Sequence, residues 1–473
     1  MGLSLFNKRI CNTYPGVIKT CDNVALTVTP KPMTDGVGND VPIQIGTSTI
    51  CYGGTQDFSG ATVIGITAAT AGLVSGGGTN SMVSAGSLGV LSTADGDCSV
   101  SIGSGAYNCC EKSINIGQGS TGLESCVIGI GFATSNTGAN SIALGNSSAG
   151  TGNCSISIGE GAQSGAADAI GIGRSSNARC LNSISIGALS DVLSSNTTAV
   201  GVSTCIGPSS NSSSVFGQAA TTLSDSSVAM GLATCVGTSA SQSIAIGCGS
   251  FISTTTCAGG HLWSVAIGSA ARVCDGGGAN GSYRSIAIGQ NATVTCNHGI
   301  ALGFDSCVND SYGIAVGVLA NAANNAVSIG WSAGPTVSGC GTCSVYVGRD
   351  AGSNFACTVN IGPSAITNGN QAISIGHVSQ NNSSGGISIG HNSVNTSGSK
   401  GITIGENACI NNILATCAIA IGYNVLANRA STLTTCELET CVAGCGLIVK
   451  TPDGLNSYRI AVDNSGNITT ALA

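Results

Sequence analysis

Short runs of alternating apolar and small residues recur along the chain, and glycine closes each run. At 141–145 the residues are Ser-Ile-Ala-Leu-Gly, so Ile142 and Leu144 alternate with Ser141 and Ala143. This is the period of a β-strand, whose side chains point alternately to its two faces. The pattern therefore predicts many short strands. It recurs at Ile156/Ile158, Ile184/Ile186, Ile244/Ile246 and Ile373/Ile375.

The closing glycines, which we call anchors, mark a repeat of 14 residues. The chain contains 22 anchors, and 13 of the 21 spacings between them equal 14. Glycine adopts positive φ readily and lets another backbone approach closely, so we expect each anchor at a tight structural corner. The first eight anchors are evenly spaced: Gly103, Gly117, Gly131, Gly145, Gly159, Gly173, Gly187 and Gly201.

A unit of 14 residues is too short for a helix and a strand, but it accommodates two short strands and two turns. We therefore predict an all-β fold, a parallel β-solenoid (β-roll) over residues 98–425 in which each repeat forms one coil. Stacked strands lie about 4.8 Å apart. Roughly 22 coils would then make a rod of about 100 Å.

One such coil is thin, because two or three apolar side chains per turn do not offset the ordering cost of 14 residues, about 1–2 kcal/mol for each backbone position. An Ile-x-Ile pair fills one strand face, and we expect the small residues on the other face to admit a neighbouring chain. The sequence thus favours a homotrimer around a common axis. A dimer and a monomeric solenoid are the alternatives.

Composition narrows the class of protein. Only 7% of the 473 residues are charged and 4% are aromatic, but 42% are hydrophobic and the net charge is −7. Disorder requires lower hydrophobicity and more charge, and collagen requires glycine at every third position. A compact enzyme normally carries more ionisable groups. The isoelectric point near 4.9 excludes a basic nucleic-acid-binding face.

The N-terminal residues 1–16 lack the apolar core of a secretory signal, and no run of about 18 apolar residues occurs in the chain. We therefore expect synthesis in a host cytoplasm and no insertion into a membrane.

Units such as NSIALGNSSAGTG at 140–152 and NSISIGALS at 182–190 resemble the 14-residue YadA-like head repeats of trimeric autotransporter adhesins. The resemblance covers about 98–425. It implies a trimeric, left-handed parallel β-roll that projects from a surface and binds host or matrix ligands. The chain departs from those adhesins in showing no signal peptide, heptad stalk or C-terminal membrane strands.

The two ends resemble a different class of protein. The segments 12–23, 33–40 and 57–65 look like N-terminal regions of bacteriophage fibre proteins, and 447–473 is similar to terminal β-segments of phage structural proteins. The turn residues Pro-Asp-Gly and Asn-Ser-Gly predict three C-terminal strands. These strands are expected at 447–451, 458–463 and 467–472.

The resulting division has four parts. We expect a virion-attachment and stem region at 1–70, a connector at 71–97, the solenoid at 98–425 with an irregular, loop-bearing part at 248–347, and a β-hairpin cap at 426–473.

Many of the 24 cysteines occupy fixed positions in the repeat. One set lies five residues before an anchor and another four residues after one. Other repeats hold small residues there, which favours buried free thiols. Disulfides between neighbouring coils are the alternative, with Cys343 and Cys357 as the best candidates. Cys436, Cys441 and Cys445 could cross-link chains near the cap. The first set is Cys98, Cys126, Cys154, Cys343, Cys357 and Cys417, and the second is Cys205, Cys235, Cys307 and Cys409.

The sequence predicts no catalytic residue and no cofactor. His377 and His391 each follow an anchor and lie 14 residues apart, so they should stack. In a trimer six imidazoles could hold a metal, but exposed polar corner residues are the simpler interpretation. The nearest acidic pairs, Asp305 with Asp310 and Asp95 with Asp97, are interpreted as turn residues rather than as paired catalytic carboxylates.

The irregular part of the repeat predicts a receptor patch. Two consecutive spacings of 21 add seven residues to each of two adjacent coils, and 251–355 holds 8 of the 17 aromatic residues. Insertions in solenoids often form a binding face. Aromatic rings with polar neighbours suit a surface glycan, although the rings could instead fill the loop bases. The proposed residues are Phe251, His261, Trp263, Arg272, Tyr283, Arg284, Trp331 and Tyr346.

The sequence therefore predicts a non-enzymatic fibre on a virion surface, a phage tail or head fibre that attaches to the host. Its expected partners are itself as a homotrimer, other virion proteins through the N-terminal region, and a host receptor. A bacterial surface adhesin of trimeric β-roll type and a purely structural virion decoration protein are the alternatives.

Overall fold

The structure, a computed structural model, divides into two compact units, 1–70 and 71–473. It describes residues 19–20, 25, 29, 31–34, 40–45, 50–52, 73–75, 77–84, 92–253, 262–274, 284–337, 340–436, 447–452, 455–463 and 465–472. Within these ranges every regular element is a strand. No helix in them is long and apolar enough to cross a membrane.

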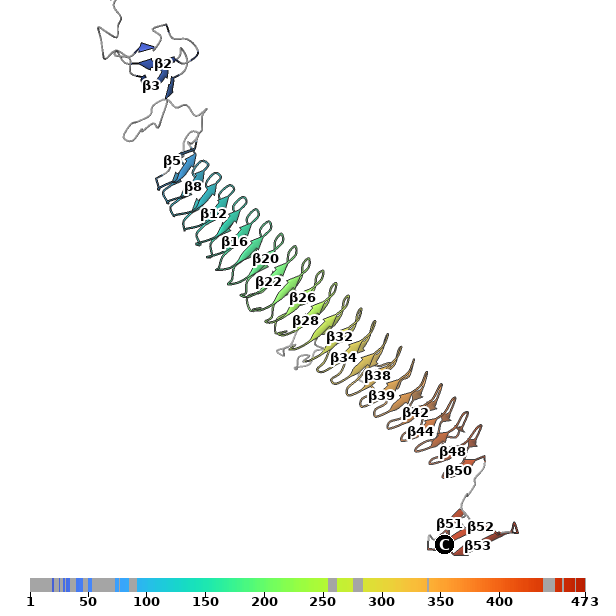
Figure 1. Cartoon of the computed structure of the whole chain (residues 1–473). Helices are drawn as coiled ribbons and strands as arrows, with labels where there is room; N and C mark the ends of the chain where they lie inside the picture. The colour runs from blue at the N-terminus through green and yellow to red at the C-terminus, as the bar shows by residue number, and fades with distance from the viewer. Residues whose placement is uncertain are drawn as a thin grey trace, which may run out of the picture. The chain divides into compact units, whose positions relative to one another are not determined.

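The first unit contains a four-stranded antiparallel sheet in chain order (Figure 1). β2 pairs with β1 and with β3, and a bulge interrupts the second pairing between Pro32 and Met33. β4 pairs with the C-terminal half of β3. The strands are β1 Lys19–Thr20, β2 Lys31–Thr34, β3 Asp40–Ile45 and β4 Ile50–Tyr52.

The second unit is a β-solenoid, which confirms the predicted fold class (Figure 1). Its first sheet contains the 22 strands that end before the anchors, from β8 to β48, and β50 after them; these 23 strands pair in parallel and in register. Ile142, for example, lies opposite Ile156, and Leu144 lies opposite Ile158. At the N-terminal end β6 adds a parallel strand, and β5 Leu73–Ser75 pairs antiparallel with it.

The strands of the first sheet are β6 Met82–Ser84, β8 Val100–Ile102, β10 Ile114–Ile116, β12 Ile128–Ile130, β14 Ile142–Leu144, β16 Ile156–Ile158, β18 Ile170–Ile172, β20 Ile184–Ile186, β22 Thr198–Val200, β24 Ser214–Phe216, β26 Val228–Met230, β28 Ile244–Ile246, β30 Val265–Ile267, β32 Ile286–Ile288, β34 Ile300–Leu302, β36 Ile314–Val316, β38 Val327–Ile329, β39 Val345–Val347, β40 Val359–Ile361, β42 Ile373–Ile375, β44 Ile387–Ile389, β46 Ile402–Ile404, β48 Ile419–Ile421 and β50 Leu433–Thr435.

The other side of each coil forms a second sheet of shorter parallel strands, split into runs of 16 and 5. The first run is β7 Thr93–Ala94, β9 Tyr107–Asn108, β11 Thr121–Gly122, β13 Ser135–Asn136, β15 Ala149–Gly150, β17 Gln163–Ser164, β19 Asn177–Ala178, β21 Asp191–Val192, β23 Cys205–Ile206, β25 Thr221–Thr222, β27 Cys235–Val236, β29 Phe251–Ser253, β31 Arg272–Cys274, β33 Thr293–Val294, β35 Cys307–Val308 and β37 Asn321–Ala322. The second run is β41 Ile366–Thr367, β43 Gln380–Asn381, β45 Val394–Asn395, β47 Cys409–Ile410 and β49 Leu426–Ala427.

The stack extends past both predicted boundaries of the solenoid. β7 lies in the expected connector and pairs with β9, and β50 lies in the expected cap and pairs with β48. After it, residues 447–472 form a separate antiparallel sheet of β51 Leu447–Lys450, β52 Ser457–Val462 and β53 Ile468–Leu472. These three strands lie where the turn residues predicted them.

Each coil turns at residues with positive φ. In the coil after Gly145, the anchor itself has φ 129°, Ser147 has φ 54° and Cys154 has φ 57°. The last two lie in the left-handed region that other residues tolerate. The anchor needs glycine, because a Cβ on Gly145 would lie 2.6 Å from the carbonyl oxygen of Gly159. All eight evenly spaced anchors have φ between 127° and 144°.

The interior of the solenoid contains mostly small side chains. The middle residue of each first-sheet strand from β8 to β48 points inward, as Ala143 does, and is fully buried. Ile142 and Leu144, on either side of it, point outward and are half-buried. This corrects the expectation that the small residues face a neighbouring chain. They face the chain's own second sheet, which contributes larger side chains such as Val192 and Ile206.

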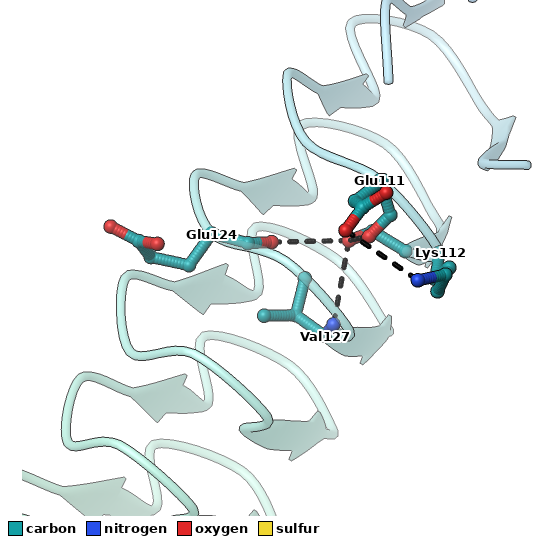
Figure 2. Close-up of polar contacts among 5 residues, drawn as sticks. Glu111, Lys112, Glu124 and Val127 are labelled. Carbon is teal, nitrogen blue, oxygen red and sulfur yellow. Dashed lines mark hydrogen bonds and ion pairs between the residues drawn. The ribbon is translucent and has the colours of Figure 1, made fainter. Parts of the chain in front are cut away.

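Hydroxyl groups stabilise the turns between coils. The Oγ of Ser113, four residues before its anchor, donates to the carbonyl oxygens of Glu111 at 3.2 Å and Glu124 at 3.1 Å. It also accepts the backbone N–H of Val127 at 3.4 Å. The side chains of Glu111 and Lys112 form an exposed ion pair beside it (Figure 2). A single small polar residue thus satisfies backbone groups of two successive coils.

The break in the second sheet lies beside Tyr346. Tyr346 occupies the inward position that holds a small residue in most coils, and it is the largest fully buried side chain among the described residues. Its hydroxyl donates to the carbonyl oxygen of Ser353 at 2.9 Å. The two adjacent coils hold Gly334-Pro335 and Gly352-Ser353 where the others have strand residues. Proline lacks the N–H that a ladder needs. Gly341 leaves room for the phenol, because a Cβ there would overlap the Tyr346 hydroxyl.

We predict that Gly145→Ala destabilises the solenoid by about 3 kcal/mol or more, because the substitution combines a glycine-specific φ with backbone overlap. Gly249→Ala is the control, since Gly249 has φ +63° and nothing lies within 4 Å of an added Cβ. It should cost only about 1–2 kcal/mol. Chemical denaturation of both variants measures the difference, and equal losses would contradict this account of the anchors.

Candidate functional site

Three rows of outward side chains run along the stack, because residues at the same position of successive coils lie about 4.8 Å apart. The first corner row contains the residue after each anchor. The outer row contains the fourth residue after each anchor, on the second sheet. The second corner row contains the residue five before each anchor.

The second corner row carries a run of four large side chains in successive coils. The guanidinium carbon of Arg284 lies 5.0 Å from the ring centroid of Trp263. In the next two coils the rings of His298 and Tyr312 stack with centroids 4.9 Å apart and planes 7° apart. Trp263 is 48% exposed and Tyr312 is 57% exposed. The prediction included Trp263 and Arg284 but missed His298 and Tyr312, whose shared repeat position could have revealed them.

The other two rows repeat the pairing of an aromatic ring with an arginine in the next coil. In the outer row the guanidinium of Arg272 lies 5.8 Å from the ring centroid of Phe251. In the first corner row the guanidinium of Arg349 lies 5.7 Å from the ring centroid of Trp331. At exposed sites such a contact contributes about 0.5–1 kcal/mol. These pairs stabilise the stacking of neighbouring coils.

The residues of the predicted receptor patch therefore do not form one surface. They lie on three rows, and each ring has a face directed at the adjacent coil rather than at solvent. The ring edges and the arginine side chains remain for contact with a partner. Phe251 and Arg272 lie in the outer row, Trp263 and Arg284 in the second corner row, and Trp331 in the first corner row, whereas His261 and Tyr283 lie outside the described residues.

Tyr346 was predicted as a residue of the receptor patch, and the structure corrects this. Its ring is fully buried between the two sheets, and burial raises the pKa of its hydroxyl above the ordinary value of 10. The residue belongs to the alternating pattern of β39, where the middle position points inward. Tyr346 therefore does not reach a receptor, and its role is to shape the wall of the coil.

The two histidines stack as their spacing predicted. The ring centroids of His377 and His391 lie 5.3 Å apart with planes 5° apart, and the Nδ1 of His391 lies 3.7 Å from an Oε1 of Glu406 in the next coil. Parallel rings hold their nitrogens in separate planes, so their lone pairs do not converge on one ion. Among the described residues, no three His, Cys, Asp or Glu side chains gather as a metal site would require.

The cysteines differ between the two repeat positions. Those in the second corner row are exposed, which corrects the interpretation of this set as buried thiols. This position is an outer turn with positive φ, and its side chain points to solvent. Cys343 and Cys357 occupy successive coils there as free thiols. The exposed set is Cys98, Cys126, Cys154, Cys343, Cys357 and Cys417.

The cysteines of the outer row are partly covered by their neighbours in the row. Burial raises the pKa of the Cys235 thiol above its ordinary value, and it does the same for Cys205, Cys307 and Cys409. Near the end of the stack, Cys436 is exposed. Cys441 and Cys445, the other two predicted cross-linking residues, lie outside the described residues.

No protein-family model matches the chain, and no curated protein matches it. Among solved structures, the chain is similar to the collagen-binding domain of the Yersinia adhesin YadA, at 20% sequence identity. The match covers 43% of this chain and 79% of that chain, with a TM-score of 0.17.

We predict that alkylation distinguishes the two cysteine sets. At pH 8, iodoacetamide should modify Cys126 and Cys154 about tenfold faster than Cys235 and Cys307, because the thiolate is the reactive form and burial disfavours it. The difference between the two alkylation rates should narrow as the pH rises toward the raised pKa of the outer-row thiols. Mass spectrometry of isotope-labelled peptides measures each rate. Equal rates in the folded protein would contradict the assignment, and equal rates after denaturation are the control.

Proposed function

We propose that the chain is the shaft of a homotrimeric, non-enzymatic fibre on a virion surface and that the fibre attaches to a host. The observation that carries the proposal is the outward apolar face of the first sheet. The flanking residues of its strands remain half-exposed along the stack, and contiguous apolar surfaces of this extent mark interaction sites. Exposed fractions include Ile114 36%, Ile130 43%, Ile288 39%, Ile329 42% and Ile404 38%.

Further copies of the same chain are the occupants that fit this face. Only a stack with the same spacing between coils keeps its side chains in register with the outward side chains of the first sheet over 23 strands. The resemblance of the repeat to the head repeats of trimeric adhesins sets the number at three. In such a trimer the corner rows and the second sheet stay outside, where they are available to a receptor.

The ends of the chain support the virion assignment. Residues 1–70 form a compact unit separate from the solenoid, as suits a module that joins other virion proteins. The C-terminal sheet of β51, β52 and β53 lies in the segment that resembles phage structural proteins. The host receptor, for which a surface glycan is our candidate, would contact the outward rows.

We predict that the triple variant Ile130→Asp, Ile288→Asp and Ile404→Asp dissociates the trimer, because each carboxylate would be buried without a partner at the interface. Light scattering should give three times 45.9 kDa for the wild-type chain and 45.9 kDa for the variant.

The matched control places the same charges on the second sheet, at Thr121→Asp, Thr293→Asp and Val394→Asp. These side chains point outward in the outer row, so the control should remain trimeric. A wild-type chain that scatters as a monomer would refute the proposed assembly.

We predict that antibody against residues 90–425 labels tail tips in immunogold electron microscopy of particles and cells from the source. Label over the capsid would instead indicate a head fibre or decoration protein and would contradict a primary role in attachment. Label on cell surfaces with none on particles would overturn the virion assignment in favour of a bacterial adhesin.

A further inference from the structure

The break in the second sheet, between β37 and β41, leaves a groove on the outer face of the solenoid. The groove has a volume of about 350 Å³, within the range of small-molecule sites. Six of its nine lining residues are polar, and the lining comes from three successive coils. The polar residues are Ser332, Thr336, Asp350, Ser353, Asn354 and Asn368.

The groove exists because two coils in succession lack a side chain in the outer row. Gly334 and Gly352 occupy that row, between Asn321 in the preceding coil and Ile366 in the following one. Any Cβ on Gly352 would lie 2.6 Å from the carbonyl oxygen of Gly334, so the two backbones are in close contact. The hollow is thus a property of the backbone and does not depend on a movable side chain.

The walls of the groove are fixed by hydrogen bonds. The hydroxyl of Tyr346 donates to the Ser353 carbonyl oxygen from inside the coil. In regular coils that carbonyl accepts the N–H of the preceding coil. Here the N–H of Thr336 instead donates to the Oδ1 of Asn354 at 3.0 Å, and the N–H of Val337 donates to the same atom at 3.2 Å. The amide of Asn354 therefore replaces the missing ladder.

The remaining polar groups define the ligand. Asp350 is the one charged residue of the lining, and its Oδ2 lies 3.2 Å from the Nε of Arg349, which offsets its charge. The side-chain amide of Asn368 donates to the Oδ1 of Asn382 at 2.6 Å, and the same side chain also carries an acceptor oxygen. The amide and hydroxyl groups offer both donors and acceptors, the carboxylate adds acceptors, and Arg349 balances its charge. This set suits a neutral, hydroxyl-rich ligand better than an ion or an apolar molecule.

The residue that precedes the groove residue Ser332 in the chain adds exposed apolar surface. Trp331 immediately precedes Ser332 in the first corner row and is 48% exposed. Sugars combine hydroxyl groups with apolar C–H surface, and an aromatic ring beside a polar groove offers contacts to both. We propose that this groove binds one hexose unit of a glycan. The inference deepens the proposed attachment function and rests on it only for the source of the sugar.

A fluorescence titration tests the proposal on the full chain. Trp263→Phe leaves Trp331, at the edge of the groove, as the only tryptophan of the two. Glucose, galactose, mannose and N-acetylglucosamine are the probes. At least one should change the Trp331 emission saturably, and Asp350→Ala and Asn368→Ala should each weaken that binding by about tenfold or more.

Asp305→Ala is the matched control, because Asp305 occupies the same repeat position as Asp350, two residues after its anchor, in a coil outside the groove. It should leave the titration unchanged. Absence of a saturable response to all four sugars, or equal binding by Asp350→Ala and the control, would overturn the proposal.

Binding of the same proteins to host cells, measured in parallel, separates the two proposals. Cell binding without any sugar response would refute the groove and leave the attachment function standing. A sugar response that depends on Asp350, without cell binding, would support the groove and refute the attachment function.

Discussion

The structure depends on the close approach of backbone at the anchor glycines. Gly145 has a φ that favours glycine, and any side chain on it would overlap the backbone of Gly159 in the next coil. This contact turns the chain tightly enough for 14 residues to form a coil, and it holds successive coils in register. The rows of stacked side chains, in the core and on the surface, follow from that register.

The thinness of the coil then decides what the core contains. The two sheets lie so close that the inward position of the first sheet holds mostly alanine or serine, as at Ala143 and Ser157. The Ser157 hydroxyl, for example, is hydrogen-bonded to the carbonyl oxygen of Ala149 at 2.7 Å and to the Oγ of Ser164 at 2.9 Å. The larger apolar side chains of the first sheet must point outward. A single chain therefore lacks cover for its most hydrophobic face, and this is the physical basis for the proposed assembly.

The groove shows how one exception to the repeat creates a local feature. A tyrosine in place of a small residue at position 346 requires room across the coil, and Gly341 supplies it, since a Cβ there would overlap the Tyr346 hydroxyl. The Tyr346 hydroxyl donates to the Ser353 carbonyl oxygen, which in regular coils accepts a backbone N–H of the ladder. The Oδ1 of Asn354 accepts the N–H of Thr336 instead. The sheet is interrupted at that point, and polar groups that would otherwise lie in a strand surround a hollow.

Sequence spacing by itself determined the solenoid, its corner glycines and the stacking of His377 on His391, because a fixed period places equivalent residues one above another. The turn residues Pro-Asp-Gly and Asn-Ser-Gly determined the three C-terminal strands. It did not determine which face of each strand turns inward, since a period of two is the same for both faces. Only the tertiary structure decided that Ile142 lies outside and Ala143 inside, because only small side chains fit between sheets this close. The burial of Tyr346 and the exposure of Cys154 were likewise decided there, by the space that neighbouring coils leave and by the direction of each turn.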